Sequence, residues 1–287
     1  MTTAVEPVPQ TFAARTADGH EFQVIAVIPS NPQSSLLWLS AMGVASRNYI
    51  PLAREFAAQG IAVFLHEWRG NGSSSLRASR KVNWGYREIL EQDLPQTQSI
   101  VERELPGLPR RIGGHSLGGQ LACCYAGLNP DAANAGVWLA CSGSPYYRCF
   151  PVPHNVYVRL AYYVFPLLAK LNGHFPGKLL SFAGNEAAGM MRDWSRTALT
   201  GVYAVRNMGI NMDELMAQRT APVTGVVTTQ DWLAPKASME FLQGKFTKAS
   251  RECIVLNGND LGLAPDHFTW MKSPKRLADE FLRLIRA

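Results

Sequence analysis

One pentapeptide in the chain has the residue types needed for nucleophilic catalysis. Residues Gly114 to Gly118 read Gly-His-Ser-Leu-Gly, which is the pattern G-x-S-x-G. An apolar run that ends at Ile112 precedes it, and a helix-like segment, 119–126, follows it. Strand, sharp turn and helix in that order are typical of a nucleophile elbow, and the two glycines lack the Cβ that would crowd such a turn. We therefore predict that Ser116 is a nucleophile.

A serine hydroxyl requires a neighbouring base, and the base requires a carboxylate that orients it. In chains with this elbow the order is serine, acid, histidine, so both partners are expected after Ser116. Asp231 comes three residues after an apolar run, at the strand end where open α/β sheets place their sites. His267 lies in a loop beyond the last expected strand, from which its ring can reach over the strand ends. The weaker alternatives for the acid are Asp260 and Asp266.

Two backbone N–H groups are the expected donors to the negative charge that develops on the attacked carbonyl oxygen. In proteins with this elbow, one donor belongs to the residue after the nucleophile, which is Leu117 here. The second donor comes from the loop after an earlier strand, where residues 40–49 include several small side chains and Gly43. We assign this second donor to Met42.

The composition is that of a globular protein. Of the 287 residues, 47% are hydrophobic and 17% are charged, and the net charge is +6. The basic residues are scattered, and their densest clusters, at 77–81 and 110–111, are not interleaved with aromatic residues. We therefore predict a small-molecule substrate and no nucleic-acid partner.

The five cysteines show neither a C-x-x-C spacing nor a histidine-rich neighbourhood, so we predict no metal site. Reduced thiols are typical of a cytoplasmic protein. The first residues lack the basic and apolar regions of a secretion signal. No stretch of about 20 residues is apolar enough to span a bilayer, so we expect no stable membrane insertion. The predicted chemistry requires no cofactor.

Apolar runs typical of buried strands alternate with helix-like segments up to residue 143, which predicts a mostly parallel sheet flanked by helices. The alternation stops there and resumes near residue 216. We therefore predict an α/β core formed by residues 1–143 and 216–287, interrupted by a helical insertion at 144–215. The expected strands are 12–15, 22–28, 36–39, 61–65, one through Ile112, 135–140, 223–227 and 253–256, and the expected helices are 50–58, 86–105 with a break near Pro95, 119–126, 236–243 and 274–285.

These segments together resemble the α/β-hydrolase superfamily. The resemblance is carried by the elbow, by Asp231 and His267, and by the stretch from Tyr49 to Ser74. It is closest to the serine hydrolases that include monoacylglycerol lipases, lysophospholipases and serine aminopeptidases. It implies an α/β-hydrolase fold and a Ser-His-Asp triad.

Three shorter segments, 41–44, 175–178 and 260–262, are similar to a poorly characterised bacterial group of predicted α/β hydrolases. Two positions depart from the superfamily pattern. Ser40-Ala41 stands where His-Gly is usual, and Glu67 stands where an aspartate is usual. The first departure concerns the shape of the loop that carries Met42.

The resemblance also implies that residues 144–215 form a cap over the active site. The insertion is rich in tyrosine, phenylalanine, leucine and methionine, which suits an acyl-binding cleft. One alternative is that most of these side chains form the core of the insertion itself, and another is a lid that opens on a lipid surface. The expected substrate contacts are His115, Tyr146, Tyr147 and Phe165.

We therefore predict a serine hydrolase that cleaves a carboxylic ester, of a lipid-like or acylglycerol type, through an acyl-enzyme. One alternative is an acyltransferase or a carbon–carbon bond hydrolase that uses the same three residues. Another is a non-catalytic binding protein of α/β-hydrolase fold. A homodimer is left open.

Overall fold

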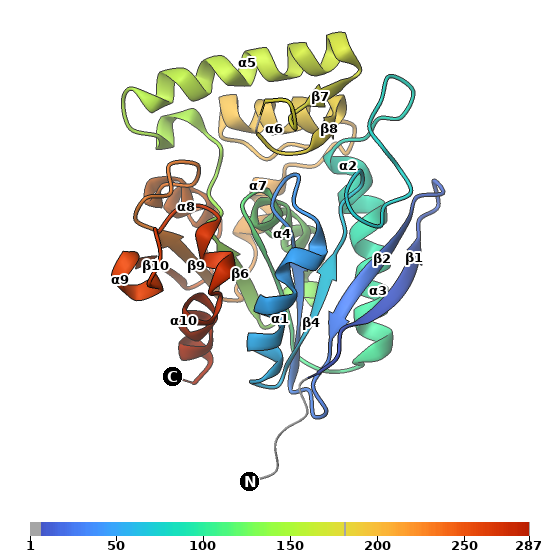
Figure 1. Ribbon diagram of the computed structural model, residues 1–287, viewed down its shortest axis with the longest axis vertical. Helices are drawn as coiled ribbons and strands as arrows, with labels where there is room; N and C mark the ends of the chain where they lie inside the picture. Colours follow the sequence, from blue (N-terminus) through green and yellow to red (C-terminus); the bar gives the residue numbers. More distant parts are fainter. Residues whose placement is uncertain (1–6, 181, 287) are drawn as a thin grey trace.

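A computed structural model describes residues 7–180 and 182–286 of the chain. Within them, an eight-stranded sheet has the order β1-β2-β4-β3-β5-β6-β9-β10 (Figure 1). The β1 and β2 strands form an antiparallel edge, β2 pairs antiparallel with β4, and all the other pairs are parallel. The strands are β1 Gln10–Arg15, β2 Glu21–Val27, β3 Ser34–Leu39, β4 Ile61–His66, β5 Arg110–His115, β6 Gly136–Ala140, β9 Val223–Thr228 and β10 Arg251–Leu256.

Helices cover both faces of this sheet, which explains why its central strands are continuous apolar runs. In β3, Leu36 and Trp38 pack into the core on the side of α1 and α10, whereas Leu37 and Leu39 pack on the side of α3 and α4. Both faces of the central strands are therefore buried. The helices of the core are α1 Ile50–Ala57, α2 Tyr86–Glu88, α3 Leu94–Glu104, α4 Leu117–Leu128, α7 Met212–Ala217, α8 Lys236–Gln243, α9 Gly258–Leu261 and α10 Lys275–Arg286.

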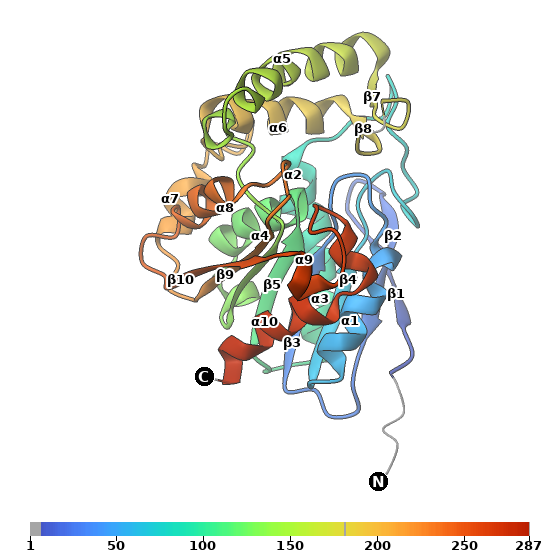
Figure 2. The ribbon, with the colours of Figure 1, turned by 60° about the vertical axis from the view of Figure 1, so that its left-hand side comes forward.

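A cap lies over the carboxyl ends of the parallel strands. It contains α5 (His154–Asn172), α6 (Ala188–Thr200) and a small hairpin of β7 (His174–Pro176) and β8 (Asn185–Ala187). Figures 1 and 2 both place α5 outermost, with α6 between α5 and the core.

The structure differs from the predicted elements in three places. The segment expected as one helix broken near Pro95 consists of α2, a π-helical turn at Ile89–Asp93 and α3. The β7–β8 hairpin interrupts the insertion that was expected to be helical. Helix α7 lies inside the predicted insertion but packs on α4 of the core, where a Cβ at Gly127 would come within 3.2 Å of Leu215. The cap itself therefore ends before α7.

Candidate active site

Ser116 stands in a strained turn between β5 and α4. Its backbone has φ 55° and ψ −123°, a conformation that residues with a side chain rarely adopt. The turn closes only because Gly114 and Gly118 have no side chain: a Cβ on either would lie within 2.7 Å of the Leu39 carbonyl oxygen. Ser142 Oγ donates to the Ser116 carbonyl at 2.5 Å and fixes the turn from the β6 side.

Asp231 follows β9 and His267 follows the neighbouring strand β10, and the two side chains are in contact. Nδ1 of His267 lies 2.7 Å from Oδ2 of Asp231, and both side chains are almost fully buried. The other carboxylate oxygen, Oδ1, accepts hydrogen bonds from the N–H groups of Leu233 at 2.9 Å and Ala234 at 2.8 Å. The carboxylate thus accepts three hydrogen bonds, one from the ring and two from the turn, and it orients the imidazole with Nδ1 protonated.

The side chain of Asp266, one of the alternatives for the acid, binds the backbone of its own loop. Its Oδ1 accepts hydrogen bonds from the N–H groups of Phe268 at 2.8 Å and Thr269 at 2.7 Å. The structure therefore pairs the ring of His267 with Asp231 and uses Asp266 to shape the loop that carries the ring. The other alternative, Asp260, accepts a hydrogen bond from the N–H of Asn257 at 2.8 Å in a capping box at α9.

Met42 and Leu117 line the same cavity as Ser116. Within the described ranges 7–180 and 182–286, neither N–H has a hydrogen-bond acceptor, so both are free to donate. Leu117 is the first residue of α4, where the helix dipole adds positive potential. The two groups predicted to stabilise an oxyanion are therefore available for that purpose.

The loop that carries Met42 is held by buried polar contacts on both sides. Glu67, at a position where the superfamily usually has aspartate, accepts hydrogen bonds from the N–H of Ser46 at 3.2 Å and from its hydroxyl at 3.0 Å. Burial raises the pKa of the Glu67 carboxyl. Nε1 of Trp68 donates to the Ser40 carbonyl at 2.8 Å. These contacts fix the loop although it lacks the usual His-Gly pair.

His115, predicted as a substrate contact, lies behind the site. Its side chain is fully buried and is not among the described residues that line the cavity. The N–H of Ala41 donates to the Tyr49 hydroxyl at 2.9 Å, and that hydroxyl lies 2.8 Å from Nδ1 of His115. Since burial raises the pKa of Tyr49 and lowers that of His115, the link consists of neutral groups. His115 ties the elbow to the loop of Met42 and backs the ring of His267 at a centroid distance of 4.7 Å.

A cavity of about 550 Å³ lies between the cap and the strand ends, and both Ser116 and His267 line it. Among the described residues, no hydrogen bond joins the Ser116 hydroxyl to the His267 ring. Catalytic hydrogen bonds of this kind are often long before substrate binds. Of the other expected contacts, Phe165 lines the cavity, whereas Tyr146 and Tyr147 are not among its described lining residues and make an edge-to-face contact with each other. The remaining walls are mainly apolar, from α5, α6 and the loops of Asp231 and His267: Pro145, Phe150, Tyr157, Val158, Ala161, Tyr162, Phe182, Trp194, Trp232, Leu233 and Phe268.

Trp232 and Phe268 were not predicted from the sequence. Each directly follows a residue of the predicted triad, each lines the cavity, and each is about half exposed, at 56% and 45%. Their positions next to Asp231 and His267 in the sequence could have revealed them, because both of those residues follow the ends of strands, where the entrance of the site lies.

Glu186 of β8 is a second residue that the sequence did not reveal. Together with Met42 and Leu117 it lines a very small cavity behind the two N–H donors, beside Arg69. The Glu186 side chain is buried and accepts one hydrogen bond, from the N–H of Gly184 at 3.2 Å. Burial raises the pKa of this carboxyl to about 7, and the hydrogen bond from Gly184 offsets only part of that rise. The carboxyl therefore titrates near neutral pH in the folded protein.

Glu186→Gln should remove a pH dependence of stability. A carboxyl whose pKa is about 7 when folded and 4.5 when unfolded binds more protons in the folded state, so its contribution is full below pH 4.5 and declines as the pH rises to 7. Relative to the parent, the variant should gain about 3 kcal/mol in the free energy of unfolding between pH 4.5 and pH 8. Urea denaturation at both pH values measures this, with exposed Glu214→Gln as the control. An equal pH dependence in parent and variant would rule out the shift.

Comparison with known proteins identifies the family of the chain. Residues 30–258 match the family model described as serine aminopeptidase, S33. The chain belongs to this family. This S33 member is 30% identical over 103 residues to human monoglyceride lipase, a match that covers 36% of the chain and 33% of the lipase. It is 34% identical over 106 residues to an uncharacterised abhydrolase domain-containing protein of Dictyostelium discoideum, which covers 37% of the chain and 11% of that protein. The chain thus spans a third or less of these curated relatives.

A solved structure shows the same fold as this S33 member over nearly its whole length. A thermophilic esterase from Thermogutta terrifontis superposes with a TM-score of 0.64 at 15% identity, over 96% of this chain and 98% of the esterase. The predicted α/β-hydrolase fold, with a mostly parallel sheet flanked by helices, is therefore confirmed, and so is the resemblance to serine aminopeptidases and monoacylglycerol lipases.

Proposed function

We propose that this S33 family member is a serine hydrolase that cleaves carboxylic esters. The observation that carries the proposal is the 2.7 Å contact between Asp231 and His267 inside a cavity that Ser116 also lines. A buried carboxylate that orients an imidazole beside a serine hydroxyl is the arrangement that activates such a hydroxyl. Membership in a hydrolase family agrees with it.

In the proposed mechanism, the Ser116 hydroxyl attacks the ester carbonyl carbon and His267 takes its proton at Nε2. Asp231 stabilises the imidazolium that results, because it accepts the Nδ1–H. The N–H groups of Leu117 and Met42 donate to the carbonyl oxygen as it becomes negative. The imidazolium then protonates the leaving alcohol, and a water molecule, deprotonated by the same ring, hydrolyses the acyl-enzyme.

The cavity favours an apolar acyl group. Its volume of about 550 Å³ lies in the usual range for small-molecule sites, and its walls are aromatic and aliphatic. On the cap side, Phe165 and Tyr162 of α5 contribute to these walls. The similarity to human monoglyceride lipase is consistent with a lipid-like ester, including an acylglycerol.

A panel of p-nitrophenyl esters with acyl chains of two to sixteen carbons tests the proposal. We expect hydrolysis, with kcat/KM rising with chain length until the cavity is filled, because each buried methylene contributes about 0.8 kcal/mol to binding. Phe165→Ala should shift this optimum to a different chain length, while Tyr146→Ala, outside the cavity, should leave it in place. Transfer to an added alcohol in preference to water would favour the acyltransferase alternative. A complete lack of turnover and of probe labelling would favour a binding protein.

A further inference from the structure

Helix α5 carries apolar side chains around its whole circumference, although only one side of it is covered. A helix of this kind is normally buried on all sides. The inward side chains that line the catalytic cavity are Val158, Ala161, Tyr162 and Phe165. The outer stripe, whose members are each between 55% and 63% exposed, consists of Val156, Leu160, Tyr163, Leu167 and Leu171. Figure 1 shows this helix at the outermost edge of the cap. The side chains of the outer stripe are therefore more than half exposed in the part of the chain that the structure describes.

The surroundings of the outer stripe are basic. From Asp131 to Glu186 the sequence contains no aspartate or glutamate between these two residues. The same stretch contains four cationic residues, two of them within α5: Arg148, Arg159, Lys170 and Lys178. On α5 itself, the stripe is therefore accompanied by two positive charges, those of Arg159 and Lys170, and by no acidic residue.

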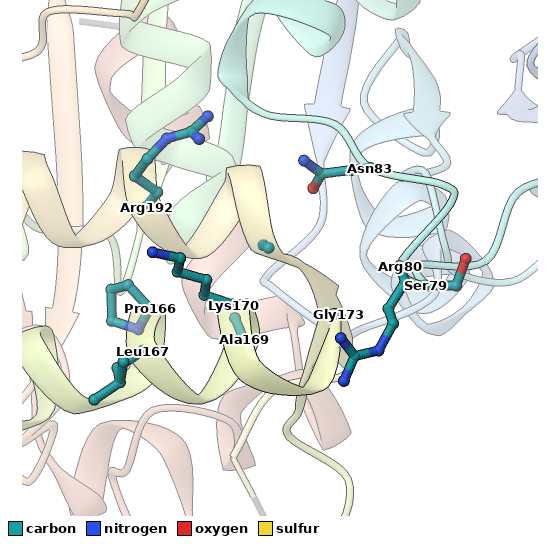
Figure 3. A pocket seen from close by; sticks show the side chains of 10 residues that line it. Ser79, Arg80, Asn83, Pro166, Leu167, Ala169, Lys170, Gly173 and Arg192 are labelled. Carbon is teal, nitrogen blue, oxygen red and sulfur yellow. The ribbon is translucent and has the colours of Figure 1, made fainter.

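A basic groove adjoins the stripe. The groove, of about 560 Å³, lies between α5, α6 and residues 79–83, and Leu167 of the stripe forms part of its wall (Figure 3). Three cationic side chains line it, one from each segment, and the described lining residues include no acidic side chain: Arg80, Lys170 and Arg192.

The three cations retain capacity to bind an anion. Nη2 of Arg80 donates to the Leu171 carbonyl at 2.5 Å, and Nε of Arg192 lies 3.7 Å from Oδ1 of Asp193, which leaves most of each guanidinium unused. Within the described part of the chain, the Lys170 ammonium has neither a hydrogen bond nor an ion pair. Three cations around one groove suit a phosphate group.

We propose that the outer stripe of α5 docks on an anionic lipid bilayer and that the basic groove binds a headgroup phosphate. Helices with apolar residues on one face and flanking lysine or arginine lie in the plane of the interface, with the apolar face among the acyl chains. None of the helices in the described residues is long and apolar enough to cross a membrane, so this contact is peripheral. Each cation near an anionic surface strengthens binding about fivefold.

Charge favours a bilayer over a second copy of the chain as the occupant. In a symmetric dimer through this face, the same patch of both protomers would meet, and the cations of α5, Arg159 and Lys170, would be brought close to the cations of the other copy. An anionic membrane instead offers opposite charge to every cation of the cap. The docking surface and the catalytic cavity share α5, so a lipid-like ester could pass from one to the other if the proposed function holds.

Sedimentation with vesicles tests the docking separately from catalysis. The full chain with Ser116→Ala is mixed with vesicles of phosphatidylcholine alone or with 30% phosphatidylglycerol, chosen as the probe composition. We expect binding mainly to the anionic vesicles, and release as the salt concentration rises. Leu160→Asp with Leu167→Asp should weaken binding at least about tenfold. The control is Val8→Asp, an apolar position that is 73% exposed and lies just before β1, outside the cap.

Charge variants separate the groove from the stripe. Lys170→Glu should weaken binding to anionic vesicles by more than about fivefold, since it replaces an attraction by a repulsion. Lys272→Glu, at a residue before α10 that is not among the described residues lining the groove, should have a smaller effect. Inorganic phosphate, added up to the concentration of lipid phosphate in the sample, should not release the protein from the vesicles, because it offers no apolar contact to the stripe.

Two results would overturn the proposal. One is equal binding by the parent and the Leu160/Leu167 variant, or equal binding to both vesicle types. The other is a dimer in sedimentation equilibrium that the Leu160/Leu167 variant dissociates, which would make this face a contact between two copies. With Ser116 restored, the stripe variants should still hydrolyse a soluble short-chain ester at the parental rate, so a failure of docking and a failure of the proposed function are distinguishable.

Discussion

Replacing Ser116 with alanine should abolish labelling by a fluorophosphonate probe and lower kcat for ester hydrolysis by about 10⁶-fold. In the proposed mechanism the probe and the substrate both react with the hydroxyl of Ser116, which lines the cavity together with His267. The substitution removes a single oxygen from a turn whose backbone is set by neighbouring glycines, so the fold should be retained. Gel fluorescence and steady-state kinetics measure the two effects, and a thermal melt checks the fold.

Ser195→Ala is the matched control for this experiment. Ser195 is a buried serine of α6 that does not belong to the described lining of the cavity. Its replacement should leave labelling and kcat within a few-fold of the parent. If the Ser116→Ala protein were folded and still labelled to the same extent, the assignment of the nucleophile would be wrong.

Asp231→Asn should lower kcat by about 10⁴-fold while leaving labelling slow but detectable. The asparagine oxygen can still accept the hydrogen bonds from the N–H groups of Leu233 and Ala234. Its NH₂ group would then face Nδ1 of His267, which stabilises the tautomer with the proton on Nε2. In that tautomer the ring has no lone pair for the Ser116 proton.

Asp266→Asn distinguishes the orienting acid from its sequence neighbour. Asp266 also lines the cavity, but its carboxylate accepts backbone N–H groups of its own loop. We expect this variant to keep kcat within about tenfold of the parent. A loss as large as that of Asp231→Asn would contradict the assigned roles.

Much of the core could be predicted from the sequence, because a strand that is buried on both faces is an unbroken run of mostly apolar residues and is easy to recognise. The β3, β4 and β9 strands fill both sides of the sheet and stand out as apolar runs. The β7–β8 hairpin could not be predicted in this way, since three-residue strands are too short to show a period. The position of α7 was missed for a different reason: its contact with α4 depends on Gly127, whose role appears only in three dimensions.

The predicted site residues were accessible to sequence analysis to different degrees. The elbow is a local motif, and chain order limited the search for Asp231 and His267. His115 was expected to contact the substrate, but its side chain is fully buried. The chain turns sharply at the next residue, Ser116, and the sequence does not tell which of the two side chains faces the cavity. Cytoplasmic location and a homodimer stay predictions.

The contact between Gly43 and the cap has a consequence for how enzymes of this kind diversify. A Cβ on Gly43 would lie 2.1 Å from the backbone nitrogen of Gly184 and 2.5 Å from the carbonyl carbon of Ala183. The backbone between β7 and β8 therefore contacts the backbone of the loop that carries Met42. A chimaera that received the cap of another family member without its matching loop would displace the backbone of Met42, the proposed donor to the oxyanion. These two segments should therefore be inherited, and engineered, as one module.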